Sequence, residues 1–444
     1  MPTWYRKPFR SNPRVGEPLN RSLLRQPSIF AWSLYDWANS AFATTVMAGF
    51  FPVFFKQFWS QGVVATESTY RLGMANSLAS LVVVCLAPLL GALADQAGAK
   101  KRFLLFFASM GIVMTGALYL VAQGNWVAAL SLYALAVLGF VGGNVFYDAL
   151  LISVTRERHY DRVSAYGYAF GYLGGGVLFA INVVMTLYPE SFGLKDAAEA
   201  VRVSFLTVAV WWAVFSLPLF LLVEEPRTTA SKRGWFRAGI KQLLETFRKL
   251  RQLKMTWLFL LAYWCYIDGV DTIVRMAVDF GLSIGFDANN LMIALLIAQF
   301  VGFPSALAFG ALAGRRGPKQ GIMLAIFTYL LILLWAYRMD SVWEFYLLAV
   351  AIGLVQGGIQ ALSRSLYARL IPADQSAEFF GFYNMLGKFA VVLGPLLMGW
   401  IGVMTGSNRL AILSVGVLFV IGGGILMKVD VRAGEEAARC MRRS

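Results

Sequence analysis

The sequence is poor in charged residues, in cysteine and in histidine. Only 14% of its 444 residues are charged and 58% are hydrophobic, whereas about 25% of the residues of a soluble domain are charged. The three cysteines, Cys85, Cys265 and Cys440, lie far apart, so the spacing indicates neither a disulfide framework nor a metal site. The single histidine, His159, falls in a predicted loop, which excludes a histidine relay within a membrane. We expect an integral membrane protein.

Long apolar segments occupy most of the chain and are long enough to cross a bilayer as helices. They predict an all-α fold. The basic N-terminal region precedes an apolar segment too long for the core of a signal peptide, so we expect the first span to be retained. The twelve predicted spans are residues 29–55, 72–94, 103–122, 126–152, 163–187, 203–223, 255–280, 288–312, 321–337, 343–367, 379–404 and 409–428.

Lysine and arginine are distributed unevenly between the two predicted sides. Of the 39 cations, 30 lie on the side of the termini, six on the other side and three within spans, at Arg275, Arg364 and Lys388. Such an excess marks the cytoplasmic side, so both termini are predicted to be cytoplasmic. The same sorting explains the net charge of +15 without a nucleic-acid partner. Short loops without an outer N-x-[ST] sequon favour a bacterial inner membrane.

One long loop, residues 224–254, divides the spans into two groups of six. Within it, apolar residues such as Trp235 and Phe247 alternate at helical spacing with basic ones such as Lys241. This predicts a basic amphipathic helix on the inner leaflet, which serves either as a simple linker or as a regulatory or partner site. The predicted organisation is a tail 1–28, a first half 29–223, the linker 224–254, a second half 255–428 and a tail 429–444.

A short motif recurs at the ends of the second and eighth predicted spans. The skeleton G-A-L-A-x-x-x-G-x-K begins at Gly91 and again at Gly310. Repeated halves of this kind are typical of the major facilitator fold. Asp95 is predicted to cap the positive end of a neighbouring helix, and the second copy has Gly314 in its place. We predict a conformational switch formed by Gly91, Asp95, Gly98, Lys100 and Lys101.

The first copy resembles the loop signature of the major facilitator superfamily, with Gln96 in place of a usual basic residue. Further stretches look like the vacuole-effluxer (autophagy-related amino-acid effluxer-like) family, and they lie at 34–42, 266–272, 357–365 and 378–383. The resemblance covers about residues 30–428. It implies a secondary transporter of twelve helices, with amino-acid export known for fungal relatives. Asp148 departs from the family's pattern, in which Asn is expected.

Polar residues within the apolar spans form the candidate site for substrate or ions. The resemblance implies that the first, fourth, seventh and tenth spans line a central cavity. Residues three or four positions apart share a helix face, so each of these spans carries a polar stripe, and an acid within a membrane is functional by default. The candidates are Asp36, Asn39, Asn144, Tyr147, Asp148, Asp268, Asp271, Arg275, Gln356, Gln360 and Arg364, with Lys388 on the eleventh span.

Two of these groups have structural alternatives. Asp271 and Arg275 are four residues apart and would neutralise each other as an ion pair. Arg364 would pair with Asp36 or Asp148 as a gate near the inner face. Desolvated carboxylates take up protons more readily, so the intramembrane acids, Asp268 included, are also the predicted proton carriers.

The sequence therefore predicts a proton-coupled secondary transporter of small polar organic solutes, amino acids first, that works by alternating access as a monomer. No Walker motif is present, so no ATPase is indicated, and we expect neither a cofactor, a metal nor an enzyme activity. The alternatives are a carrier of sugars, osmolytes or peptidoglycan fragments, and a receptor or scaffold that transports nothing. A scaffold would have no reason to keep buried charges on four spans.

Overall fold

The computed structural model describes residues 23–63, 65–225, 253–283, 288–389 and 393–441. These residues form helices joined by short loops, and no strand occurs among them. The predicted all-α membrane fold is therefore confirmed. The predicted amphipathic helix of the 224–254 loop falls almost wholly outside the described residues, as does the N-terminal tail through residue 22.

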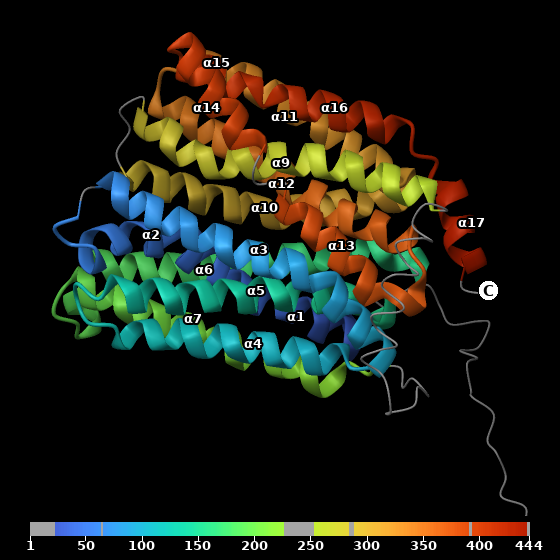
Figure 1. Ribbon diagram of the computed structural model, residues 1–444, viewed down its shortest axis with the longest axis horizontal. Helices are drawn as coiled ribbons and strands as arrows, with labels where there is room; N and C mark the ends of the chain where they lie inside the picture. The colour runs from blue at the N-terminus through green and yellow to red at the C-terminus, as the bar shows by residue number, and fades with distance from the viewer. Residues whose placement is uncertain (1–22, 64, 226–252, 284–287, 390–392, 442–444) are drawn as a thin grey trace, which may run out of the picture.

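Six helical crossings build the first half of the chain (Figure 1). The first crossing combines α1 (Pro27–Ala41), a π-helical segment (Phe42–Phe50), α2 (Phe51–Phe54) and a second π-helical segment (Phe55–Trp59). The other five crossings are α3 (Ala65–Ala97), α4 (Lys100–Ala117), α5 (Trp126–Val154), α6 (Tyr160–Leu187) and α7 (Ala197–Leu222).

The second half repeats this number of crossings. Its first four are α9 (Lys254–Ser283), α10 (Ala288–Arg316), α11 (Pro318–Arg338) and α12 (Val342–Arg369). The pair α13 (Ser376–Phe389) and α14 (Leu393–Thr405) forms the next, and α15 (Asn408–Ser414) with α16 (Gly416–Met427) forms the last. Among the described residues, 11 helical segments are long and apolar enough to cross a membrane, and α3 completes the twelve.

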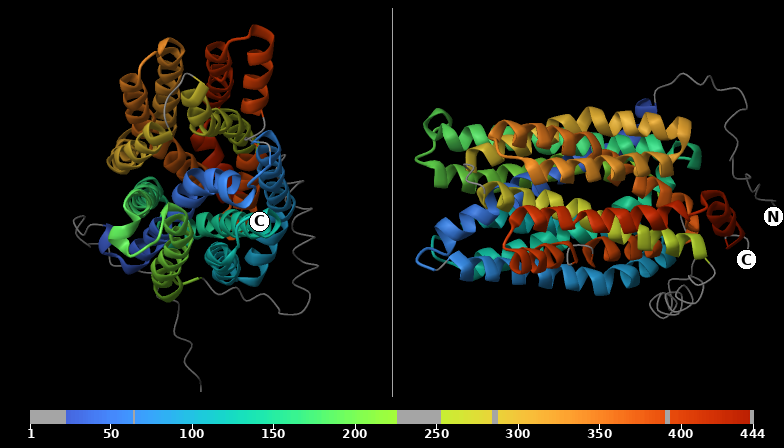
Figure 2. Two further views of the ribbon diagram at one scale, coloured as in Figure 1. Left: turned by 90° about the vertical axis from the view of Figure 1, so that its left-hand side faces the viewer. Right: turned by 90° about the horizontal axis from the view of Figure 1, so that it is seen from above.

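The crossings lie side by side along the long axis of the molecule, in two groups that the end-on view separates (Figures 1 and 2). A last helix, α17 (Val431–Met441), lies across one end of the bundle. Because successive crossings alternate in direction, that end also holds the loops 98–99, 155–159 and 370–375. We call it the α17 end, and it is the side to which the sequence assigns the excess of lysine and arginine.

A lysine fastens the sixth crossing of each half at the α17 end. The Nζ atom of Lys101 donates to two carbonyls at the end of α7. The Nζ atom of Lys319 donates to two carbonyls at the end of α16, at 2.9 and 2.7 Å. The last carbonyls of a helix lack partners within it and attract cations. The repeat in the sequence aligns Lys319 with Lys100. In the structure, however, Lys319 plays the same part as Lys101, one residue later.

Candidate functional site

A polar cavity of about 300 Å³ lies between the two halves. Its walls come from α1, α5 and α6 in the first half and from α9, α10, α12 and α13 in the second. The predicted polar stripes therefore converge. The structure brings together ten of the candidates: Asp36, Asn39, Asn144, Tyr147, Asp148, Asp271, Gln356, Gln360, Arg364 and Lys388.

The cavity also has polar and aromatic walls that the sequence analysis did not single out. Gln299 of α10 and Asn384 of α13 line it, as do Tyr168 and Tyr172 of α6. They were missed because the search was confined mainly to four spans. One signal was present, since Gln299 is the one carboxamide in the sequence from residue 291 to 316, and Tyr168 and Tyr172 are one helical turn apart.

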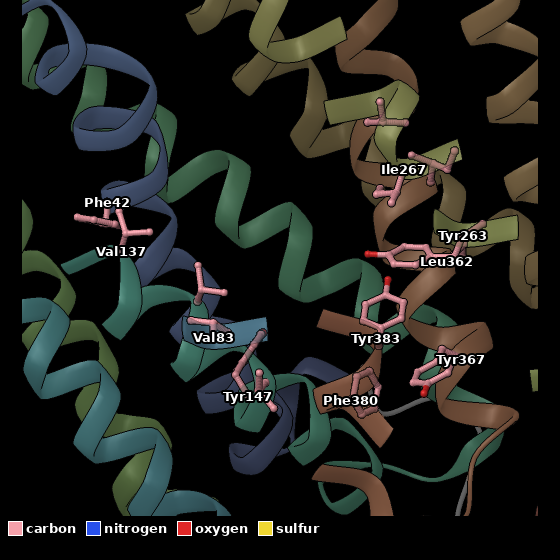
Figure 3. Close-up of a cluster of buried hydrophobic side chains, with 14 of the residues drawn as sticks. Phe42, Val83, Val137, Tyr147, Tyr263, Ile267, Leu362, Tyr367, Phe380 and Tyr383 are labelled. Carbon is pink, nitrogen blue, oxygen red and sulfur yellow. The ribbon is translucent and has the colours of Figure 1, made fainter. Parts of the chain in front are cut away.

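Two further tyrosines come from the second half. Tyr263 of α9 and Tyr383 of α13 line the cavity, and their rings stack with centroids 4.2 Å apart (Figure 3). Both side chains are nearly buried. This stacked pair joins the seventh and eleventh crossings beside the cavity. It adds a flat aromatic surface to a wall that otherwise carries amides and charges.

At the α17 end of the cavity, Arg364 of α12 reaches into the first half. Its Nη1 lies 3.1 Å from Asp148 Oδ1 and 3.5 Å from Asp36 Oδ2. The guanidinium also donates to the hydroxyl and the carbonyl of Ser164, each at 2.9 Å. Only 2% of the arginine side chain is exposed. A buried cation is tolerable only when it is paired and hydrogen-bonded, and the partners Asp36, Asp148 and Ser164 all belong to the other half.

Aromatic rings enclose this arginine. Its Cζ lies 4.8 Å from the ring centroid of Trp32 and 4.3 Å from that of Tyr168, within the range of cation–π attraction. The Tyr147 hydroxyl donates to Asp36 Oδ2 at 2.7 Å. Gly167 makes room for the group, because a Cβ there would come 2.6 Å from the carboxylate of Asp36 and 2.8 Å from Arg364.

Carboxamides connect further helices around the cavity. Asn39 donates to Asn144 at 2.8 Å and so joins α1 to α5. Asn384 of α13 donates to the second oxygen of Asp148 at 3.1 Å. Asn384 therefore belongs to the hydrogen-bonded system of the charged cluster, in which movement of one half against the other changes the partners of Asp148.

Two sequence candidates stand apart. Asp268 does not line the cavity; it is fully buried, and both carboxylate oxygens accept from the backbone N–H of Gly394 at 3.1 Å. Gly394 is in the first turn of α14, so Asp268 satisfies the open N-terminus of that helix. The structure therefore corrects the prediction that Asp268 belongs to the candidate site for substrate or ions. Arg275 belongs to α9, but its side chain lies outside the described structure, as does its suggested pairing with Asp271.

Three of the predicted switch residues, Gly91, Asp95 and Lys100, contact the second half at the α17 end. Asp95 Oδ2 accepts from the backbone N–H of Glu378 at 2.8 Å, in the first turn of α13, which confirms the predicted helix cap. Its other oxygen lies 2.9 Å from Lys100 Nζ, and that amine also donates to Ser376 at 2.6 Å. A Cβ on Gly91 would come within 2.3 Å of the α13 backbone, so only glycine permits this approach.

The turn after Asp95 also needs glycine. Gly98 has φ of 56°, in the left-handed region that residues with a Cβ avoid. This turn lets Lys100 and Lys101 begin α4 directly beside Asp95 and the end of α7. Gly91, Asp95 and Lys100 therefore lie against α13, whereas Lys101 binds the end of α7 within the first half.

A chain of alternating charges adds a third connection at the α17 end. Asp161 of α6 pairs with Arg369 of α12 at 2.7 Å, and Arg369 faces Glu435 of α17 at 3.8 Å. Arg439 lies 3.9 Å from Glu435 and 2.7 Å from Glu157 in the α5–α6 loop. Burial raises the pKa of Glu435, and the nearby Arg369 opposes the shift. The chain crosses between the halves twice, so it contributes to closing this end.

Comparison with known proteins gives a consistent result. The family described as "Vacuole effluxer Atg22 like" matches residues 64–439. The chain is 38% identical over 411 residues to a Bacillus subtilis protein named "Uncharacterized MFS-type transporter YxiO", covering 92% of this chain and 96% of that protein. It is 28% identical over 315 residues to "Autophagy-related protein 22" of Yarrowia lipolytica, covering 62% of this chain. That match spans only about half of the fungal protein, 51% of its length.

Solved structures agree on the fold. The human organic anion transporter MFSD10 superposes with a TM-score of 0.67 at 14% identity, over 90% of this chain and 99% of that one. The transporter FucP, in its outward conformation, gives a TM-score of 0.68 at 12% identity, over 92% and 100% of the two chains. FucP is a major facilitator superfamily transporter, and at these identities both structures establish the architecture alone.

Proposed function

Because the chain belongs to the family of Atg22-like vacuole effluxers, transporters of the major facilitator superfamily rather than enzymes, we propose that it transports small polar organic solutes, with amino acids as the first class. The observation that carries this proposal is the cavity between the halves, which presents carboxylates, cations and carboxamides together. A zwitterionic solute needs partners of both signs, and Asp271 and Lys388 offer them on the second half.

We propose that the α17 end faces the cytoplasm, as the distribution of lysine and arginine favours. The Arg364 cluster, the Asp95 contact and the charge chain then close the cavity on the cytoplasmic side. Alternating access requires these three contacts to separate while the opposite end closes. A bacterial inner membrane and a monomer acting alone complete the proposal.

Proton coupling is proposed to run through Asp36. This carboxylate lies in the wall of the cavity, accepts from Tyr147 and contacts Arg364. When the halves separate at the α17 end, Arg364 withdraws with α12, and a proton replaces it as the partner of the buried carboxylate. Asp36 therefore exchanges a cross-half ion pair for a proton once in each cycle.

The test combines binding and flux. A thermal-shift screen of the purified protein over amino acids, sugars and osmolytes identifies the solute, since a ligand at 100 times its dissociation constant stabilises the folded state by about 2.7 kcal/mol. Proteoliposomes with an imposed pH gradient then measure uptake of that solute. We expect Asp36→Asn to insert normally and to lose pH-dependent uptake. If no compound shifts the melting temperature, the scaffold interpretation is favoured instead.

A second solute class has one observation in its favour. Besides charges, the cavity is lined by tyrosines and carboxamides, namely Tyr147, Tyr168, Tyr172, Tyr263, Tyr383, Asn39, Asn144, Asn384, Gln299, Gln356 and Gln360. Neutral donors and acceptors beside aromatic faces suit a hydroxyl-rich solute such as a sugar. Stabilisation by sugars but by no amino acid in the same screen would transfer the proposal to this class.

A further inference from the structure

A second hollow lies outside the transport cavity, on the membrane-facing side of the first half. It has a volume of about 320 Å³, and the side chains that line it within the described part of the chain are apolar. Leu86 and Phe106 at its rim are 41% and 63% exposed, so the groove opens toward lipid. Its lining comes from α3, α4 and α5: Val83, Leu86, Ala87, Leu90, Phe103, Phe106, Phe107, Met110, Leu138, Gly142, Val145 and Phe146.

The groove exists because two consecutive helices separate. Helix α4 packs mainly on α5 and α7, whereas α3 packs on α13 and α5. Each of the three helices turns one face to the gap, since the lining residues recur three and four positions apart. The floor is a stack of rings, in which Phe146 lies between Phe103 and Phe107 with centroids 5.2 and 5.9 Å away. Gly142 leaves room for the ring of Phe107 at the bottom of the groove, because a Cβ there would come 2.5 Å from that ring.

The position of the groove matches one leaflet of a bilayer. On α4 it runs from Phe103, in the first turn, to Met110, which is about 10 Å at ~1.5 Å per residue. One leaflet contributes about 15 Å of hydrocarbon. The groove therefore begins at the α17 end of the membrane and extends most of the way to the midplane, as one acyl chain does.

A cation stands at the mouth of the groove. Arg102 is exposed and lies four residues before Phe106, so the two side chains share a face of α4. The two preceding lysines have partners within the protein, Lys100 at Asp95 and Lys101 at the end of α7. Arg102 is thus the exposed cation of this turn, at the level of the membrane surface, where basic residues attract anionic lipids.

We propose that this groove binds one acyl chain of an anionic phospholipid whose headgroup lies at Arg102. The site is independent of the proposed solute and of its coupling. It also touches the contact between the halves, because Ala87 lines the groove while its carbonyl faces Gly381 of α13 on the other side. A bound chain therefore supports the segment of α3 that packs on the second half.

The experiment uses the full-length protein in phosphatidylcholine vesicles that contain a trace of phosphatidylglycerol with a photoreactive acyl chain. After irradiation, mass spectrometry maps the adducts. We expect adducts to concentrate on residues 103–110 and 138–146 and to be sparse on the exposed leucines of α11, Leu324, Leu331 and Leu334. Equal labelling of α11 and the groove would overturn the proposal.

Matched variants test the acyl chain and the headgroup separately. Leu86→Trp with Leu90→Trp fills the groove and should reduce its labelling to the α11 level, whereas Leu331→Trp should leave it unchanged. Arg102→Gln should lower the preference for the glycerol over the choline headgroup about fivefold, and Arg316→Gln, an exposed cation at the end of α10, should not. Equal labelling by both headgroups in the parent protein would refute an anionic ligand. The comparison of Arg102→Gln with Arg316→Gln tests the headgroup even if the tryptophan pair fails to fold.

Discussion

Removal of Arg364 is expected to destabilise the protein far more than removal of a surface arginine. In Arg364→Met, the carboxylates of Asp36 and Asp148 lose a cation at 3.5 and 3.1 Å, and Ser164 loses two hydrogen bonds. Breaking one member of a buried ion pair costs about 3–5 kcal/mol, because the remaining charge stays buried. All these partners belong to the first half, so the substitution weakens the contact between the two halves at the α17 end.

The assay is the free energy of unfolding in mixed micelles, measured by titration with a denaturing detergent. Arg409→Met is the control, since Arg409 also pairs with an aspartate, Asp340, but at an exposed position at the opposite end. An exposed pair contributes about 0–1 kcal/mol. We expect Arg364→Met to lower the free energy of unfolding several times more than Arg409→Met does.

A triple variant separates uncompensated charge from lost packing. Adding Asp36→Asn and Asp148→Asn to Arg364→Met removes all three charges of the cluster, and it should recover most of the lost stability because the cluster then holds no uncompensated buried charge. If the triple variant is no more stable than Arg364→Met, or if Arg364→Met and Arg409→Met are equal, the ion cluster is not what stabilises this end.

Further predictions concern the other contacts at this end. Asp95→Asn breaks a buried ion pair and weakens a helix cap, so it should cost about 3–5 kcal/mol. It should also raise the reactivity of a cysteine introduced into the cavity toward a reagent added from the α17 side; unchanged reactivity would contradict the switch role. Gly167→Ala forces a Cβ against Asp36 and should lower the melting temperature by several degrees, whereas Gly399→Ala, where a Cβ meets open space, should not. Burial raises the pKa of Glu435, so its contribution to stability is complete below pH ~4.5 and is lost as the pH rises through its folded-state pKa; melting curves from pH 4.5 to 7 should show this slope in the parent and not in Glu435→Gln.

Much of the fold follows from sequence because a bilayer imposes simple rules. Apolar length determines the crossings, and the sorting of cations determines which loops share an end. The predicted spans fall within the observed helices at most positions, and the helices extend beyond them: the tenth span, predicted at 343–367, is α12 (Val342–Arg369). Hydropathy measures the hydrocarbon crossing, whereas backbone hydrogen bonding continues a helix into the headgroup region and its caps.

The candidate site was less predictable because a polar stripe does not reveal which neighbour it faces. Asp268 and Asp271 are three residues apart on α9, yet only Asp271 lines the cavity, while Asp268 caps the start of α14. That cap depends on the position of the start of α14 beside α9, and only the tertiary structure gives this position. Gln299 was missed for the converse reason, because α10 reads as an apolar span until α6 is placed beside it.

The two copies of the repeated motif explain why the charged contacts between the halves differ although the two halves share one architecture. In the first copy, Gly91 lets α3 approach α13 closely and Asp95 caps that helix. In the second, Gly310 lets α10 approach α6 closely, with its Cβ position 2.4 Å from the side chain of Ala165, but Gly314 supplies no acid. The acid instead comes from α6 itself, where Asp161 binds α12. Close packing is thus shared by both interfaces, whereas the charges that hold them are placed on different helices. A transporter that must open and close one end needs both interfaces to separate together, so the contacts of Asp95 with α13 and of Asp161 with α12 have to break in the same step.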